Sequence, residues 1–351
     1  MRIEATYRVR GDAARVAEWI AFEQTVEVPP SLVDERLRRE VVGRVESVEG
    51  EVARVSYDAA LACGSLTQLV ALLAGNVSLI RGVRLVDVSI PDGALEGVRG
   101  PNFGVAGLRE RLDAFERPLL GGVIKPRGLP ADALARIAGD FARGGGDLVK
   151  DDNNIVDATR AAFVDRVRRC AAAVAEANAA TGGRCLYLAN LLAPTEELAP
   201  RLEAALDAGA AGVLVAPPLL GLDTVRHVAA GRRIVVMGHP AFTGSLVEAG
   251  LGHGVLFGTF FRLAGADGSV FGNPGGRFAG TRAACADGAA RCRAPLGAVA
   301  PCWPAPAGGM TLARIPEMRS EYGDDTVLVV GGDLLARGDV RAATETFRAA
   351  L

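Results

Sequence analysis

The sequence predicts an α/β protein of two domains: a small N-terminal α+β domain of ferredoxin-like type over residues 1–105, and a C-terminal (β/α)8 barrel over residues 106–351. The length of 351 residues suits two domains of ordinary size. From about residue 110 onward, short apolar segments alternate with Ala-rich amphipathic segments, the pattern of repeated β-then-α units. An open doubly wound sheet would need a Gly-rich dinucleotide turn, and residues 100–107 lack that pattern. We therefore expect the barrel.

The N-terminal part combines strand-like alternation with two helical stretches. Residues 3–10 and 82–90 alternate as single strands, and residues 43–57 are typical of a hairpin. Residues 13–24 and 66–74 have helical periodicity. Proline and glycine residues then interrupt the pattern, so we place the domain boundary between residues 92 and 110.

The C-terminal part predicts eight β-then-α units, about the number of residues that a (β/α)8 barrel needs. Ala-rich amphipathic helices are expected at residues 158–180, 195–208 and 279–291, among others. The strands are expected at residues 119–125, 147–152, 186–192, 212–216, 233–239, 269–272, 298–304 and 326–331.

Composition excludes several classes of protein. Half of the residues are apolar, mean hydropathy is +0.23 and the formal net charge is −2, with acids and bases interspersed. No basic stripe indicates a nucleic-acid partner, and no apolar run is long enough to cross a membrane. The N-terminus lacks the features of a signal peptide, and the six cysteines show no metal-binding spacing. We therefore expect a cytoplasmic protein with free thiols.

Only two of the 39 basic residues are lysines, Lys125 and Lys150. Arginine serves equally well for solubility, but its guanidinium does not readily give up its proton. A lysine amine can act as a base, form a Schiff base or react with CO2. The composition of the coding sequence could also explain the scarcity of lysine. The surroundings of the two lysines favour a chemical role.

Both lysines fall at expected strand ends, where barrel enzymes carry their chemistry. Lys125 ends the first strand, Lys150 and Asp152 end the second, and His239 ends the fifth. Because strand side chains alternate, Lys150 and Asp152 share a face. They could form an ion pair or, if the amine is carbamylated, half of an oxygen-ligand site for Mg²⁺.

Two motifs around these lysines resemble those of the RuBisCO large-subunit superfamily, and the chain is identified as a RuBisCO-like member of it. They are Gly-Val-Ile-Lys-Pro-Arg at 122–127 and Gly-Gly-Asp-Leu-Val-Lys-Asp-Asp at 145–152. Supporting segments follow in the family's order along the chain: 22–27, 75–77, 237–242, 263–267, 275–278, 307–309 and 323–332.

The resemblance implies a role for each matched residue. Carbamylated Lys150 would bind Mg²⁺ with Asp152 and the residue after it, Asn153, and Lys125 would transfer protons. His239 would handle substrate hydroxyl protons. The family's active sites lie between two subunits, so the resemblance also implies a homodimer or a multiple of dimers that binds a phosphorylated small molecule. Substrate-binding residues are expected at Glu23, Asn76, Arg127, Arg277, Gly308, Gly309, Gly331 and Gly332.

Departures from the family's pattern argue against carboxylation of ribulose bisphosphate. Asn153 stands where an acid is expected, which weakens a Mg²⁺ site unless Asp151 or Asp333 substitutes or no metal is used. Pro240 and Ala307 replace an arginine and a serine of one phosphate pocket, and the loop after the sixth strand has no lysine for CO2. These losses, with Gly308-Gly309 and Gly331-Gly332 retained, favour a monophosphate substrate.

Three functions stay open at this point. Decarboxylation or C–C cleavage of a 3-oxo sugar-acid phosphate ranks first, because Arg277 could bind a carboxylate. Isomerisation or enolisation of a methylthio sugar phosphate ranks second. A non-catalytic barrel that binds a sugar phosphate is the third, and the retained lysines, Asp152 and His239 argue against it.

Overall fold

The computed structural model describes residues 1–94, 97–231, 234–278 and 280–351. Its N-terminal domain is a four-stranded antiparallel sheet in the order β2-β3-β1-β4 with the β-α-β-β-α-β connectivity of a ferredoxin-like fold. The strands are β1 (Arg2–Val9), β2 (Arg44–Glu49), β3 (Val52–Asp58) and β4 (Val83–Ser89). The helices are α1 (Ala13–Glu23), α2 (Glu35–Glu40) and α3 (Leu66–Ala74), with short 3₁₀ turns at Pro30–Leu32, Ala59–Ala62 and Asn76–Leu79.

Strict alternation along β1 explains how this domain forms its core. Ile3, Ala5, Tyr7 and Val9 are fully buried, whereas the residues between them are exposed or half-buried. The Tyr7 hydroxyl donates to the carbonyl of Leu73 at the end of α3, at 2.8 Å. The helices therefore cover one face of the sheet, as the sequence pattern predicts.

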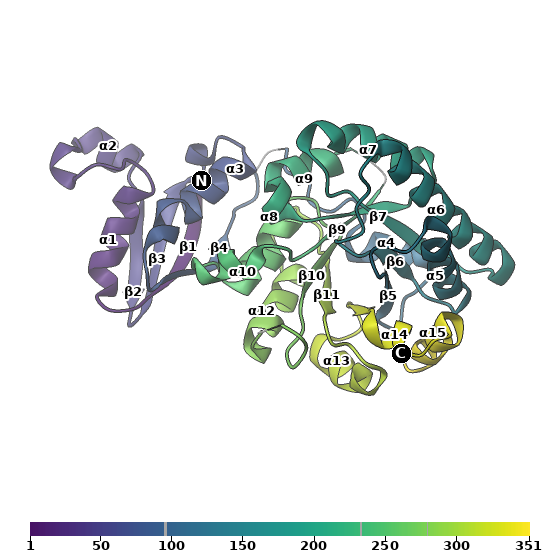
Figure 1. The fold of residues 1–351 in the computed structure, drawn as a ribbon. Coiled ribbons are helices and arrows are strands. Elements are labelled where there is room, and N and C mark those ends of the chain that lie inside the picture. Colours follow the sequence, from purple (N-terminus) through teal and green to yellow (C-terminus); the bar gives the residue numbers. More distant parts are fainter. Residues whose placement is uncertain (95–96, 232–233, 279) are drawn as a thin grey trace.

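The second domain is a closed barrel of eight parallel strands in chain order, which confirms the predicted fold class (Figure 1). The strands are β5 (Leu119–Ile124), β6 (Leu148–Asp151), β7 (Leu186–Asn190), β8 (Gly212–Val215), β9 (Val235–Gly238), β10 (Gly268–Gly272), β11 (Trp303–Ala307) and β12 (Val327–Val330). The helices are α4 (Gly104–Leu112), α5 (Ala131–Arg143), α6 (Arg160–Thr181), α7 (Thr195–Asp207), α8 (Pro217–Leu220), α9 (Leu222–Ala229), α10 (Thr243–Glu248), a π-helix (Gly254–Phe260), α11 (Phe261–Leu263), α12 (Arg282–Arg293), a 3₁₀ turn (Leu312–Arg314), α13 (Ile315–Tyr322), α14 (Gly332–Ala336) and α15 (Val340–Ala349).

Helix α4 closes the N-terminal end of the barrel. Its Leu108 and Leu112 pack with the inward-facing residues of the strands in one hydrophobic cluster. The buried carboxylate of Asp267, just before β10, accepts the N–H groups of Phe103 at 2.6 Å and Gly104 at 2.9 Å. With that end plugged, the polar ends of the strands are the side of the barrel interior that remains available for a ligand.

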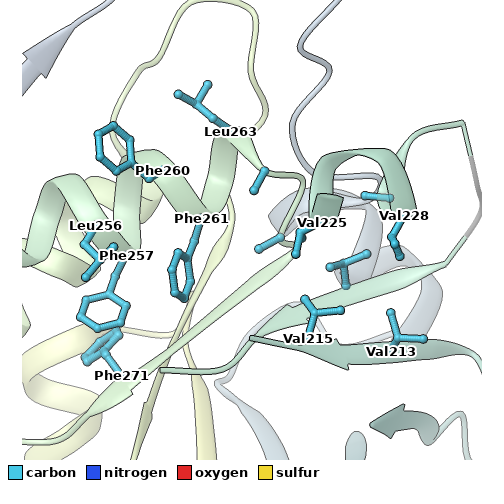
Figure 2. Close-up of a cluster of buried hydrophobic side chains, with 14 of the residues drawn as sticks. Val213, Val215, Val225, Val228, Leu256, Phe257, Phe260, Phe261, Leu263 and Phe271 are labelled. Atoms are coloured by element: carbon cyan, nitrogen blue, oxygen red, sulfur yellow. The ribbon is translucent and has the colours of Figure 1, made fainter. Parts of the chain in front are cut away.

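A second hydrophobic cluster lies outside the barrel wall, between strands β8 and β10 and the helices that cover them. Figure 2 shows Val213 and Val215 of β8 facing Val225 and Val228 of α9, with a group of phenylalanines near Phe271. The rings of Phe257 and Phe261 meet edge to face with centroids 5.4 Å apart. Burial of these side chains fixes the helices on the barrel wall.

The two domains are joined by packing between α3 and α9 and by a strand-like contact. Leu85 of β4 pairs with Leu251, and the carboxylate of Asp223 accepts from the Thr67 hydroxyl at 2.7 Å. Helices α1 and α2 lie at the end of the molecule away from the barrel (Figure 1). Among the described residues, no helix is long and apolar enough to cross a membrane.

Most predicted elements agree with the structure to within a few residues, but the seventh barrel strand was predicted wrongly. It spans Trp303–Ala307, not 298–304. Pro304 and Pro306 lack an N–H, and proline is disfavoured in a central strand for this reason. Trp303 donates its N–H to Asp267, next to β10, so alternation points the nitrogens of both prolines toward β12. The pairing between β11 and β12 is reduced to Ala307 and Val329. The fifth strand was expected to begin at residue 233 and one helix at residue 279. Both positions lie outside the described residues.

Candidate active site

The ends of β5 and β6 bring the two lysines together. Asp152, which directly follows β6, donates its N–H at 3.1 Å to the carbonyl of Ile124, the last residue of β5. The C-terminal ends of the two strands therefore lie side by side. Lys150 is the third residue of β6 and is aligned with Val123, which points into the barrel. Alternation then places Lys125, Lys150 and Asp152 on the inner side, with Lys150 deepest.

Lys150 is almost fully buried, with 4 % of its surface exposed. Its Nζ donates to the carbonyl of Asp151 at 3.2 Å. Burial lowers the pKa of Lys150 to about 8; the charges of Asp152 and Asp151 raise it in part, and the charge of Lys125 lowers it further. The lowered pKa gives this amine a larger neutral fraction near physiological pH than an ordinary lysine has, and the neutral form is the one that reacts with CO2.

Lys125 occupies space that Gly331 leaves free. A Cβ atom placed on Gly331 would lie 2.9 Å from both Cε and Nζ of Lys125. The sequence predicted Gly331 as a phosphate-binding residue. In the structure Gly331 lies against the end of the Lys125 side chain, and at Gly332 a Cβ would meet nothing within 4 Å. The absence of a side chain at Gly331 therefore gives the Lys125 amine its position over β12.

His239 directly follows β9 and is neutral. Its Nδ1 accepts the N–H of Ala241 at 3.1 Å, so in the neutral ring the proton lies on Nε2. Burial lowers the pKa of His239 to about 3, with a further decrease from the charge of Lys150. The ring can therefore donate a hydrogen bond from Nε2 without carrying charge.

The residues expected to hold Mg²⁺ offer a set of hard oxygen ligands. Asp152 and Asn153 are half-buried and follow β6 directly, and the Asn153 N–H donates to Asp152 Oδ1 at 3.1 Å. A carbamate on Lys150 would add a second anionic oxygen group beside a carboxylate and an amide oxygen, which fits Mg²⁺. Among the described residues, no group of three or more His, Cys, Asp or Glu side chains could hold a metal.

Neither acid suggested as a substitute ligand is available for this role. Asp151 is fully buried on the outer side of β6, where Arg166 Nη1 donates to it at 2.5 Å and Asn190 N–H at 2.8 Å. Asp333 accepts from the N–H of Leu312 at 3.2 Å and pairs with Arg337. Both carboxylates are held by other partners.

The loops after β10 and β11 lie against each other. Gly308 and Gly309 have φ values of 83° and 87°, which favour glycine. A Cβ on Gly308 would lie 2.8 Å from the ring of Phe278, and one on Gly309 would lie 2.8 Å from Gly276 Cα. Arg277 is exposed, with its guanidinium 5.3 Å from the centroid of the Phe278 ring.

Three other predicted site residues do not join the lysines within this chain. Glu23 and Asn76 belong to the N-terminal domain, where Asn76 Nδ2 donates to Glu23 Oε1 at 2.9 Å. Glu23 ends α1, the helix away from the barrel, and lines a groove of about 650 Å³ with Trp19 and other residues. Arg127 is exposed, two residues beyond Lys125.

Sequence reasoning did not identify Asn190, which contacts the segment after β6. Its Nδ2 donates to the carbonyls of Asn153 and Ile155, at 3.0 Å each. Its position at the C-terminal end of a barrel strand was a signal that could have marked it. Its partners depend on how β6 and β7 align in space, which periodicity does not reveal.

Comparisons with known proteins identify the family. The family described as "Ribulose bisphosphate carboxylase large chain, catalytic domain" matches residues 104–350. A protein of Rhodospirillum rubrum named 5-methylthioribulose-1-phosphate isomerase is 40 % identical, over 98 % of this chain and 94 % of its own length. A 2,3-diketo-5-methylthiopentyl-1-phosphate enolase of Geobacillus thermodenitrificans is 32 % identical, over 99 % of this chain and 91 % of its own length.

Solved structures give the same assignment. The crystal structure of a Rubisco-like protein from Rhodopseudomonas palustris superposes with a TM-score of 0.89 at 37 % identity, covering 99 % of this chain and 97 % of that one. A dimeric archaeal Rubisco from Hyperthermus butylicus has a TM-score of 0.86 at 26 % identity, covering 99 % and 90 %. The chain therefore belongs to the ribulose bisphosphate carboxylase large-chain family, on the side of the RuBisCO-like proteins and not of the true carboxylases.

Proposed function

We propose that this protein is an isomerase or enolase of a methylthio sugar phosphate, with 5-methylthioribulose 1-phosphate as its first candidate substrate. The observation that carries the proposal is the 40 % identity, over nearly the full length of both chains, to a relative with that name. The paired lysines and the neutral histidine at the barrel mouth support it, because isomerisation and enolisation share one step: a proton leaves the carbon next to a ketone.

Each residue of the site has a role in this step. The Lys125 amine takes the proton, and the electron pair of the broken C–H bond forms a C=C bond while the ketone oxygen becomes an enediolate oxygen. His239 Nε2–H donates a hydrogen bond to a substrate oxygen. The proton returns to the former ketone carbon, and the hydroxyl proton of the adjacent carbon passes to the former ketone oxygen, so the adjacent carbon becomes the new ketone and atoms and charge balance.

Asp152, Asn153 and a carbamate on Lys150 would together hold Mg²⁺. The ion, when bound, would polarise the ketone and stabilise negative charge on its oxygen. Asn153 contributes an uncharged oxygen, so we expect weaker binding than with a third anionic ligand. Lys150 lies near enough to Asp152 and Lys125 for both charges to shift its pKa, which suits this role.

Apolar side chains at the barrel mouth support an alkylthio substrate. Leu219, Phe242 and Phe278 are exposed, at 54 %, 60 % and 55 %, and follow the C-terminal ends of β8, β9 and β10. Exposed large apolar groups near a site are suited to an apolar ligand end. Decarboxylation of a sugar acid, ranked first from the sequence, now ranks second, because the relatives named above are an isomerase and an enolase of methylthio sugar phosphates.

We also propose that the complete site requires a second copy of the chain, in a cytoplasmic homodimer. Glu23 ends α1, which lies at the end of the molecule away from the barrel (Figure 1), and Asn76 is hydrogen-bonded to it. In a dimer the two residues would reach the barrel mouth of the partner subunit. The dimeric structure from Hyperthermus butylicus supports this arrangement.

Solvent deuterium exchange tests the proposal. The protein is incubated in D2O with 5-methylthioribulose 1-phosphate, with the diketo phosphate named above and with a 3-oxo sugar-acid phosphate, and the substrates are followed by NMR. We expect exchange and conversion with a methylthio substrate, and a loss of about 10²–10⁴-fold in Lys125→Met, the size of a general-base contribution. Arg136→Met, at an exposed position of α5, is the matched control. Release of CO2 from the sugar acid alone would show a decarboxylase, and no exchange with any compound would show a binding protein.

A further inference from the structure

Behind the lysines, the ends of β6 and β7 are tied together by a buried polar cluster, here called the anchor cluster: Asp151, Asp157, Arg166, Tyr187 and Asn190. Four of its members are 4 % exposed or less, and Asp157 is half-buried. Polar groups buried to this degree are costly unless each finds partners, so such a cluster implies a role for the geometry that it fixes.

Asp151 is the centre of the cluster. Its carboxylate accepts from Arg166 Nη1 at 2.5 Å, from the Tyr187 hydroxyl at 3.0 Å and from the N–H of Asn190 at 2.8 Å. Arg166 in turn donates from Nη2 to Asp157 at 2.8 Å. The Asp151 carboxylate, on the outer side of β6, is thus hydrogen-bonded to helix α6, which carries Arg166, and to strand β7.

Asn190 connects this hydrogen-bonded cluster to the turn after β6. Residues 152–155 form a turn closed by the N–H of Ile155 on the carbonyl of Asp152, at 3.0 Å. One amide nitrogen, Asn190 Nδ2, donates to the carbonyls of Asn153 and Ile155, and its Oδ1 accepts from the Leu192 N–H at 3.2 Å. This use of both N–H bonds and the oxygen requires an amide. An aspartate here would face two carbonyl oxygens with acceptors alone.

We propose that Asn190, supported by the Asp151–Arg166 ion pair, is a positioning residue that holds Asp152 and Asn153 where they complete the oxygen-ligand set of a carbamylated Lys150. The inference rests on the proposed function for the identity of that set. Asp152 and Asn153 lie beyond the end of the β6 ladder, and the contacts from Asn190 restrain the turn that carries them. A ligand set with one uncharged member depends strongly on such preorganisation.

Mg²⁺ affinity and carbamate formation in Asn190→Asp test the inference without any substrate. Titration calorimetry with Mg²⁺ and bicarbonate gives the affinity, and ¹³C NMR with labelled bicarbonate gives the carbamate. We expect Mg²⁺ binding to weaken by about 10- to 100-fold, with a matching decrease of the carbamate signal. Asn190→Ser, which keeps one donor, is expected to lie between this variant and the wild type, and it serves if Asn190→Asp does not fold.

Asn178→Asp is the matched control. Asn178 Nδ2 donates to the carbonyl of Cys185 at 2.9 Å, and its Oδ1 accepts the Cys185 N–H, at the opposite end of β7. We expect this variant to lower Tm without changing the Mg²⁺ affinity. Wild-type affinity and carbamate in both Asn190 variants, measured below their Tm, would overturn the inference. So would a wild-type chain that binds neither Mg²⁺ nor CO2, although deuterium exchange by that chain would leave the proposed function standing.

Discussion

At the scale of single residues, the position of Lys125 depends on a residue with no side chain. The Lys125 amine lies over Gly331, and a methyl group at that position would come within 2.9 Å of Cε and Nζ. The lysine is half-buried, and the end of its side chain would have to shift to make room for the methyl group. A proton-transfer group loses most of its effect when displaced by about 1 Å, by the sensitivity of catalysis to geometry.

Gly331→Ala should therefore reduce kcat by about 10²-fold while the protein stays folded. Gly332→Ala is the matched control, because a Cβ there meets nothing within 4 Å. Steady-state kinetics and a Tm measurement on both variants check this. Equal activity of the two variants would show that Lys125 does not depend on Gly331.

His239 is expected to make the free energy of unfolding decrease toward acidic pH. Its folded-state pKa is about 3, below the ordinary value near 6.5, so between these values the unfolded chain binds more protons than the folded one. The free energy of unfolding should thus fall as pH falls from 6.5 toward 3. In His239→Asn this fall should be smaller, as measured by urea unfolding at several pH values.

His227→Asn, at an exposed position of α9, is the control for the histidine prediction. Its pH profile should follow that of the wild type. If His239→Asn also follows the wild type, the imidazole of His239 is not held neutral by burial.

At the scale of secondary-structure elements, Asp267 joins α4 to the strands of the barrel floor. Its carboxylate accepts three backbone N–H groups, those of Phe103, Gly104 and Val236. Burial raises the pKa of Asp267 to about 6, and the three N–H donors limit the rise. Without this carboxylate, three N–H groups lose their acceptor at once.

Asp267→Ala should destabilise the protein by about 3–5 kcal/mol, the usual cost of removing one side of a buried charged hydrogen-bond set. Urea unfolding measures the change, with Asp113→Ala as an exposed control on the residue after α4. A loss below about 1 kcal/mol would mean that α4 is held by its apolar contacts alone.

At the scale of the whole molecule, the distance of Glu23 and Asn76 from their own barrel makes a shared site testable. Lys125→Met and Glu23→Ala should each be nearly inactive as homodimers. When the two variants are unfolded together and refolded, heterodimers form that contain one site with both changes and one site with neither. Activity should then return to about a quarter of the wild type, by statistical pairing of two chains. Mixing that restores nothing would place Glu23 outside the partner's site.

The sequence by itself was sufficient for the architecture. Period-2 alternation in β1, apolar strand segments between Ala-rich helices and the order of the motifs led to the two domains and the family. These signals are local or depend on residue type, so they are visible without the fold. Helix α2 escaped notice because none of its residues is buried, and it therefore lacks an apolar face.

What the tertiary structure alone decided is which partner each polar group has. It assigned Asp151 to Arg166 and not to the expected ligand set, placed Gly331 under Lys125 and brought Asn190 to the turn that carries Asn153. It also showed that Pro304 and Pro306 fit a strand whose nitrogens face a nearly unpaired neighbour. All of these depend on the register between segments distant in the chain, and composition and periodicity do not encode register.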